Sequence, residues 1–208
     1  QMVEDAATIH RLIYLKARQI GLSWFCAALQ VWGAAFFKNW IGGVISAGQT
    51  KSNQFMEKCR FIKEHLPYYL PLVTDNTENI TFRDSGGQIL ADPSTKDAGR
   101  GDTYNLMEVD EAAFHPYARQ NFAAYEPACE NGLLIVVSSA GDDEQQIVND
   151  WFEEMYNGAP DNGFTARFLP WSARPGRDEA WYNVRKARFA ATPGQMERQY
   201  PNTVEEAF

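Results

Sequence analysis

Apolar and polar positions follow two patterns along this chain, and together they predict strands that alternate with helices. Apolar runs of about four to eight residues are typical of buried strands, whereas a helical period over longer stretches indicates helices. We expect a hairpin at residues 79–91, where two strand-like runs flank a glycine-containing turn. The other expected strands are residues 11–15, 42–47, 104–109, 133–137 and 164–169, and the helices are 24–37, 51–65, 116–130, 144–156 and 178–190.

This alternation indicates an α/β fold. Strands joined through helices are usually parallel, because their crossover connection needs about a dozen residues or more. The near-continuous apolar runs at 11–15, 104–109 and 133–137 also indicate strands that are covered on both faces. We therefore expect a mainly parallel central sheet flanked by helices on both faces, in a single domain over residues 1–208. Ligands of such sheets bind beyond the carboxyl ends of the strands.

Composition narrows the class of protein. A chain of 208 residues that is 45% hydrophobic and 13% aromatic can bury a core and is not typical of a disordered protein. No apolar run approaches the roughly 20 residues that span a bilayer, so no membrane association is expected. The net charge of −8 argues against one continuous nucleic-acid-binding face, although a local basic track remains compatible with it. Cys26, Cys59 and Cys129 have no metal-type spacing and cannot all pair, which favours a reducing compartment.

The first candidate site is the sequence KARQIGLS, which follows the first expected strand. A usual phosphate loop reads G-x-x-x-x-G-K-[ST]. Here Lys16 replaces the first glycine, Gly21 is in place, Leu22 replaces the usual lysine, and Ser23 is in place. The loop could offer backbone N–H groups to phosphate, with Lys16 as the cation, Arg18 as a second charge and Ser23 as a ligand of Mg2+. The same residues also fit an ordinary strand–turn–helix corner with incidental basic side chains.

The second candidate site is the sequence LMEVDE, an apolar run that ends in two carboxylates. Asp110 would anchor the Mg2+ shell, and Glu111 would polarise a water for attack on a γ-phosphate. Alternatively, the pair simply opens a helix, where carboxylates are favoured by the helix dipole. Glu108 lies inside the buried strand and needs a partner.

Two further segments could complete a nucleotide site. Ser138 and Ser139 follow a strongly apolar strand, where a hydroxyl could sense the γ-phosphate, although ordinary turn residues explain the pair equally well. Arg100 lies in a glycine-rich loop ahead of the acidic strand. It could stabilise transition-state charge within its own subunit or in a neighbour, or it could pair with Asp97 or Asp102.

We interpret the remaining polar and aromatic features as structural. His10, His65 and His115 have no partner at ligand spacing, and Trp171 and Trp181 are expected to pack a late subdomain. One basic stretch could contact a phosphate backbone, but a solvated helix face is the better interpretation: Arg174, Arg177, Arg185, Lys186 and Arg188.

In this order, the motifs resemble those of the ATPase domain of the large terminase subunit of tailed bacteriophages, the motor that packages DNA into procapsids. KARQIGLS resembles that family's deviant phosphate loop, in which the lysine can stand at the start. The Arg100-Gly101 pair, residues 106–111 and residues 138–141 resemble its Arg-Gly element, its acidic Walker B pair and its coupling motif. Residues 200–208 resemble the segment that closes the ATPase domain, so the resemblance covers nearly the whole chain.

The resemblance implies a P-loop NTPase fold of the ASCE type that binds ATP and Mg2+. Gln1 is a candidate for the adenine-contacting glutamine. The implied catalytic residues are Glu111, Arg18 and Arg100, the implied metal ligands are Ser23 and Asp110, and the implied nucleotide-binding residues are Lys16, Arg18, Gln19, Gly21, Leu22, Ser23, Ser138 and Ser139.

The resemblance also implies that ATP hydrolysis drives double-stranded DNA into a procapsid. The expected partners are the DNA, a portal protein and a small terminase subunit. The active form would be a homo-oligomeric ring, whereas the isolated domain could be a monomer. We interpret the chain as an excised domain, whose full-length protein would carry a C-terminal metal-dependent nuclease domain. It would act in the host cytoplasm, transiently docked on the procapsid.

Two other readings stay open. A helicase-like, nucleic-acid-dependent ATPase should carry a second lobe with its own arginine motifs, which these 208 residues do not supply. A nucleotide-binding scaffold without hydrolysis is favoured by Leu22 at the usual lysine position and opposed by the intact Glu111. A small-molecule kinase is less favoured, because the sequence has no acceptor-pocket signature or arginine-rich lid.

Overall fold

A computed structural model describes residues 2–96, 98, 103–140, 150–192 and 194–208. Its strands are β1 (Arg11–Lys16), β2 (Ile41–Ser46), β3 (Leu72–Asp75), β4 (Asn79–Phe82), β5 (Gln88–Pro93), β6 (Leu106–Asp110), β7 (Leu133–Ser138) and β8 (Thr165–Leu169). Its helices are α1 (Met2–Thr8), α2 (Leu22–Phe36), α3 (Gln49–His65), α4 (Ala118–Ala128), α5 (Asp150–Asn157), α6 (Glu179–Arg188), α7 (Gln195–Gln199) and α8 (Val204–Ala207). Two short 3-10 helices are η1 (Ala112–Phe114) and η2 (Trp171–Ala173).

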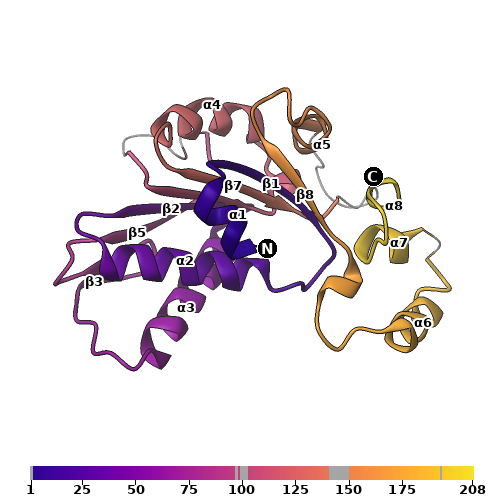
Figure 1. Ribbon diagram of the computed structural model, residues 1–208, viewed down its shortest axis with the longest axis horizontal. Helices are drawn as coiled ribbons and strands as arrows, with labels where there is room; N and C mark the ends of the chain where they lie inside the picture. Colours follow the sequence, from indigo (N-terminus) through magenta and orange to yellow (C-terminus); the bar gives the residue numbers. More distant parts are fainter. Residues whose placement is uncertain (1, 97, 99–102, 141–149, 193) are drawn as a thin grey trace.

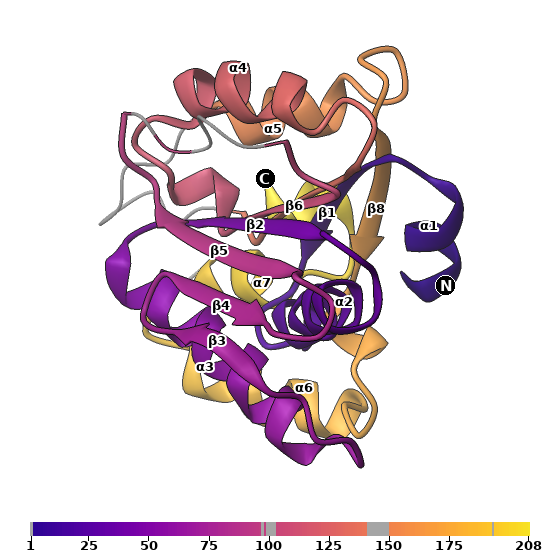
Figure 2. The same cartoon turned by 90° about the vertical axis from the view of Figure 1, so that its left-hand side faces the viewer.

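In the described residues the strands form one sheet of eight, in the order β3-β4-β5-β2-β6-β7-β1-β8. The six strands from β5 to β8 in this order pair in parallel, and β3 and β4 add an antiparallel edge. Helices α4 and α5 cover one face, and α2 and α3 cover the other (Figures 1 and 2). This arrangement confirms the expected α/β fold with a mainly parallel sheet and helices on both faces.

The central strands are buried on both faces, as their apolar runs predict. Leu12, Ile13, Tyr14 and Leu15 of β1 are each at most 1% exposed. Alternate residues of this strand contribute to different cores, because successive side chains of a strand point to opposite faces. Ile13 and Leu15 pack with the α4 and α5 side, and Leu12 and Tyr14 pack with the α2 and α3 side.

A third, smaller cluster lies at the C-terminal side of the sheet. Trp171, Met196 and Tyr200 are buried there together with Ala17. The rings of Trp171 and Trp181 stack with their centroids 5.9 Å apart, which confirms the expected packing of a late subdomain. We call residues 170–208, which include η2, α6, α7 and α8, the C-terminal segment. It lies beside the end of β1 (Figure 1).

The elements that the pattern missed are short. They are α1, the edge strand β3, α7 and α8, whose four to seven residues are too few to show a clear period. Helix α5 is described from Asp150 onward, so the first residues of the expected helix 144–156 lie outside the described residues. Cys26, Cys59 and Cys129 are buried free thiols. Within the described part of the chain, no helix has the length and apolar character to cross a bilayer.

Candidate active site

The strand order brings the candidate motifs to one edge of the sheet. Strand β7 lies between β1 and β6, and all three are parallel. In the register of these pairs, Leu15 aligns with Ser138 and Asp110 aligns with Val137. The residues that follow β1, β6 and β7 therefore leave the sheet at the same carboxyl edge, where ligands of parallel sheets bind.

The loop between β1 and α2 has a backbone shape that depends on particular residues. Gly21, the N-cap of α2, has φ 97°, a conformation that glycine adopts readily. A Cβ at Gly21 would meet nothing within 4 Å, so backbone strain and not space favours glycine there. Gln19 also has a positive φ of 58°, which is uncommon for a residue with a side chain.

Leu22 occupies the position at which a usual phosphate loop has a lysine, but its side chain does not face the candidate site. Its side chain is 1% exposed and packs in the core between α2 and the sheet. Leu22 was predicted to bind the nucleotide, but because its side chain is buried it could contribute only its backbone N–H group. The usual lysine position of a phosphate loop is here a core position, and the nearby buried cation is Lys16 at the end of β1, whose side chain is 7% exposed.

The loop carries backbone donors that are available to an anion. The N–H groups of Ala17 and Arg18 donate to Leu169 O and Gln199 O, each at 2.9 Å. Among the hydrogen bonds of the described residues, none is donated by the N–H of the next three residues, 19–21. These groups lead into the N-terminus of α2, a helix of 15 residues, where the helix dipole also favours negative charge.

Ser23 and Asp110 lie together, as the two motifs require. The Ser23 hydroxyl is 3.3 Å and 3.2 Å from the two carboxylate oxygens of Asp110. Burial and the neighbouring Glu111 raise the pKa of Asp110, and the Lys16 ammonium opposes this shift. A bound cation would offset the cost of this buried negative charge. A hydroxyl and a carboxylate are oxygen ligands that Mg2+ prefers, and Mg2+ typically takes one or two carboxylates plus substrate phosphates and water. The residues present thus fit Mg2+.

Glu111 points its carboxylate at Lys16. The Lys16 Nζ atom lies 3.4 Å from Glu111 Oε1, and the side chains are 7% and 28% exposed. Glu111 has φ 57° and ψ 44°, a left-handed conformation that costs roughly 1 kcal/mol or more in a residue with a side chain. The turn after it is held by two bonds, from Phe114 N to Glu111 O at 2.9 Å and from Ala113 N to Ser138 Oγ at 3.1 Å.

Two residues therefore support the acidic pair in ways that the sequence does not reveal. Ser138 is fully buried, and its hydroxyl accepts a hydrogen bond from the turn that follows Glu111. His115 is also buried, and its Nε2 lies 2.8 Å from Asp110 O, to which it donates. Burial lowers the pKa of His115 to about 4, so the ring is neutral at pH 7. His115 is thus structural, as expected, and fixes the backbone of Asp110.

Glu108 is a buried carboxyl next to this site. Its side chain is 0% exposed. Burial, with the nearby Asp110, raises the pKa of Glu108 well above its ordinary value of 4.5. Burial thus disfavours the charged form of this carboxyl, and a hydrogen bond from the Cys26 thiol opposes the rise in its pKa.

The structure describes only one of the two arginines that were predicted to be catalytic. Arg18 is exposed at the loop, whereas Arg100 and the candidate adenine contact Gln1 lie outside the described residues. The interpretation of the basic stretch as a solvated helix face is wrong for Arg174 and Arg177, because both bond to the backbone of the loop. Ser139 is buried, at 3% exposed.

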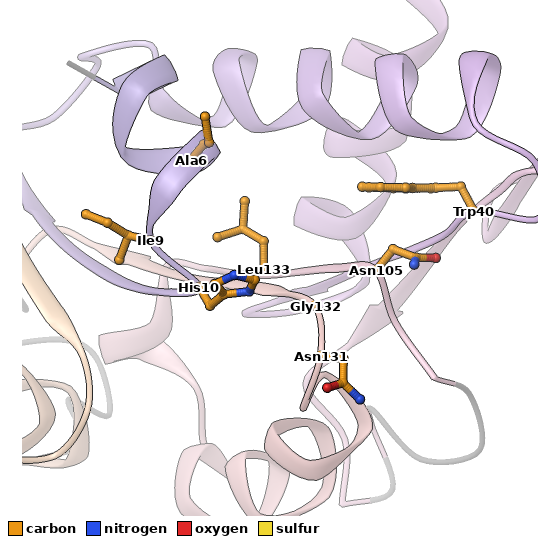
Figure 3. Close-up of a pocket in the computed structure, with 9 residues that line it drawn as sticks. Ala6, Ile9, His10, Trp40, Asn105, Asn131, Gly132 and Leu133 are labelled. Carbon is orange, nitrogen blue, oxygen red and sulfur yellow. The ribbon is translucent and has the colours of Figure 1, made fainter.

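Two of the hollows among the described residues lie at opposite edges of the sheet. The loop borders a cavity of about 670 Å³ that is lined by Gln19, Ile20, Gly21, Trp24, Arg174 and Pro175. The other hollow, of about 230 Å³, lies near the amino ends of the strands, where His10, Asn105 and Leu133 line it (Figure 3). None of the predicted site residues lines this second hollow.

Solved structures similar to this chain are large terminases. The ATPase domain of the Thermus phage P74-26 large terminase is 18% identical, with a TM-score of 0.68 over 93% of this chain and 88% of that chain. The HK97 bacteriophage large terminase is 13% identical, with a TM-score of 0.68 over 96% of this chain and 47% of that chain. A thermophilic bacteriophage large terminase in complex with ADP is also 13% identical, with a TM-score of 0.68 over 95% of this chain and 49% of that chain.

These comparisons confirm the expected α/β fold and show that it is similar to the fold of terminase ATPase domains. The chain spans most of the isolated ATPase domain and about half of the longer terminases. No protein-family model matches the chain.

Proposed function

We propose that this chain is the ATPase domain of a tailed-bacteriophage large terminase subunit, and that it hydrolyses ATP to power translocation of viral double-stranded DNA into a procapsid. One observation carries the proposal: the available N–H groups of the loop, the Ser23–Asp110 pair and the Lys16–Glu111 pair all lie at one edge of the sheet. These are the parts that phosphoryl transfer requires, since its catalysis consists mainly of positioning and charge stabilisation.

In this proposal the loop binds the phosphates of ATP. The backbone N–H groups of residues 19–23 face the phosphate oxygens, and Lys16 supplies the cation that Leu22 cannot supply. Ser23 and Asp110 would hold Mg2+, which would neutralise charge on the β- and γ-phosphates. Arg18 adds positive charge from within the loop, and Arg100 is proposed as a second arginine, in its own subunit or in a neighbour.

Glu111 acts on the water. Its carboxylate accepts a proton as the water oxygen attacks the γ-phosphorus, and the bond from that phosphorus to the bridging oxygen of ADP breaks. In the structure this carboxylate faces Lys16. A γ-phosphate that bonds Lys16 would free Glu111 for the water, so substrate binding and base release are coupled in this site.

The wider assembly is also a proposal. The partners would be double-stranded DNA, a portal protein and a small terminase subunit, and the active form would be a homo-oligomeric ring in the host cytoplasm, docked on the procapsid. The longer terminases of similar fold are about twice the length of this chain, which supports a second domain such as the expected nuclease. A non-hydrolysing nucleotide scaffold is the second candidate, because Leu22 occupies the usual lysine position in the core.

The test is Mg2+-dependent ATP turnover, measured together with ATP binding by calorimetry, for wild type, Lys16→Ala and the exposed-lysine control Lys51→Ala. We expect turnover by wild type and by the control, and loss of ATP binding in Lys16→Ala with a cooperative thermal transition retained. Binding without turnover by wild type, even with double-stranded DNA added, would favour the scaffold. Wild-type turnover in Lys16→Ala would refute the loop assignment.

A further inference from the structure

Two arginines of the C-terminal segment hold the outward carbonyl groups of the phosphate loop. Arg177 Nη1 donates to Arg18 O at 2.9 Å, and its Nη2 donates to Gln19 O at 3.3 Å. Arg174 Nη1 donates to the same Gln19 oxygen at 2.6 Å. Residues about 155 positions apart in the chain are thus joined at the loop that we assign to phosphate.

Arg177 is held in place before it reaches the loop. Its guanidinium carbon lies 4.5 Å from the ring centroid of Trp181 and 5.5 Å from that of Tyr200. Such cation–π contacts favour the cation over the ring face. Trp181 is fixed in turn, because its backbone N–H donates to Asp178 Oδ1 at 2.8 Å at the start of α6. The guanidinium therefore loses little additional freedom when it bonds the loop.

The rest of the C-terminal segment packs on the same side of the loop. Arg18 N donates to Gln199 O at 2.9 Å, and Ala17 is 0% exposed in the cluster that contains Trp171 and Tyr200. The base of the loop is thus fixed by backbone bonds and by burial, and its middle is fixed by the two arginines.

These contacts determine where the loop's N–H groups point. In a trans peptide the C=O of one residue and the N–H of the next point in opposite directions. Because the carbonyls of Arg18 and Gln19 face the C-terminal segment, the N–H groups of Gln19 and Ile20 point away from it. The left-handed backbone at Gln19, with φ 58°, is strained in a residue with a side chain, and the arginine bonds offset that strain.

We propose that Arg177, assisted by Arg174, is a positioning residue of the phosphate loop: it fixes the carbonyl side of residues 18 and 19 so that their partner N–H groups are aimed at a polyphosphate. The inference rests on the proposed function of the loop. It gives the C-terminal segment a second role, because a segment that stabilises the binding conformation must itself be stabilised when the phosphate binds. A lysine could not replace Arg177 fully, because the planar guanidinium reaches two carbonyls at once.

The test compares four variants with wild type. Arg177→Gln removes the fork and the charge, Arg177→Lys keeps the charge only, and Arg174→Gln removes one bond. The control Arg188→Gln removes an exposed charge from the last turn of α6, the helix that follows Arg177. Calorimetry measures the dissociation constants of Mg-ATP and of inorganic tripolyphosphate, a ligand with phosphates and no base, and thermal unfolding measures stability.

We expect Arg177→Gln to raise the dissociation constants of Mg-ATP and of tripolyphosphate by the same factor, about tenfold. In Arg177→Lys and Arg174→Gln both constants should rise about threefold, and in Arg188→Gln they should stay unchanged. KM for ATP should rise with these losses, while kcat at saturating ATP changes by less. If Arg177→Gln does not fold, Arg177→Lys and Arg174→Gln decide the matter.

Four results would overturn the proposal. Unchanged binding in folded Arg177→Gln would show that the loop does not need Arg177 to position it. Wild-type binding by Arg177→Lys, or a loss in Arg188→Gln equal to that in Arg177→Gln, would show that only the charge matters. Failure of wild type to bind either ligand would overturn the proposed function as well, whereas the first three results leave that function intact.

Discussion

Replacement of Glu111 by glutamine should separate the proposed ATP binding from the proposed ATP hydrolysis at this site. The amide has nearly the shape of the carboxylate but carries no charge and does not accept the proton of the attacking water. General-base catalysis is typically worth about 10²–10⁴ in rate, which is roughly 3–5 kcal/mol. We therefore expect kcat to fall by that factor in Glu111→Gln.

The same change should strengthen ATP binding. Lys16 Nζ and Glu111 Oε1 are 3.4 Å apart, for which the Coulomb attraction is about 5 kcal/mol at an effective dielectric constant of 20. Because the glutamate side chain is 28% exposed, water screens this attraction, and the net value of the pair is about 1 kcal/mol. ATP has to displace this pair to bond Lys16, so its loss should tighten ATP binding about fivefold.

The assay is equilibrium binding of Mg-ATP to Glu111→Gln, with single-turnover hydrolysis of the same samples. Glu64→Gln, which neutralises an exposed glutamate of α3, serves as the control for a change of one charge. Hydrolysis that stays within tenfold of wild type would refute the role of Glu111 with the water. Weaker ATP binding in Glu111→Gln would refute the competition between Glu111 and the phosphate for Lys16.

Three further substitutions test the site and its surroundings. Gly21→Ala should cost about 1–2 kcal/mol in urea unfolding, because φ is 97° while the space is open; an unchanged midpoint would refute the strained backbone. Leu22→Lys should lower the melting temperature by more than about 8 °C through burial of a charge, and tighter ATP binding at wild-type stability would show instead that this position can face phosphate. Arg167 donates to both oxygens of Asp5, at 3.0 Å and 2.9 Å, and lowers the pKa of Asp5 below its ordinary value of 3.8. As the pH falls, the unfolded chain therefore takes up this proton before the folded chain does. At pH 7 Asp5→Asn should lower the free energy of unfolding by about 1–2 kcal/mol. Melting curves should show that the difference in stability between the variant and wild type disappears below about pH 4.

The fold and the place of the site could be predicted because they depend on local patterns. Apolar runs predict buried strands wherever both faces are covered, and the loop and the acidic pair each follow such a run directly. The strand order then brings Ser23 to Asp110 without any further information in the motifs. The short elements α1, β3, α7 and α8 were missed, since their structure depends on packing more than on period.

Contacts between distant parts of the chain could not be predicted. Arg174 and Arg177 belong to a stretch whose composition is typical of a solvated surface, and nothing local indicates that they bond residues 18 and 19. The burial of Leu22 was hidden for a related reason. A motif comparison assigns a role to the position, whereas the packing of α2 on the sheet decides where the side chain points.

The two strained non-glycine residues of this site are placed where the chemistry needs them. Gln19 lies in the loop that we assign to phosphate, and Glu111 carries the carboxylate that we assign to the water; both have a left-handed backbone. Each is held by contacts from elsewhere in the chain, Gln19 by the arginines of the C-terminal segment and the Glu111 turn by Ser138. Such strain persists only where the surrounding structure compensates for it. If the loop or the acidic turn were placed in another protein without these supporting contacts, its strained backbone should relax. The proposed phosphate binding and water activation would therefore depend on the C-terminal segment and on β7 as much as on the motifs themselves.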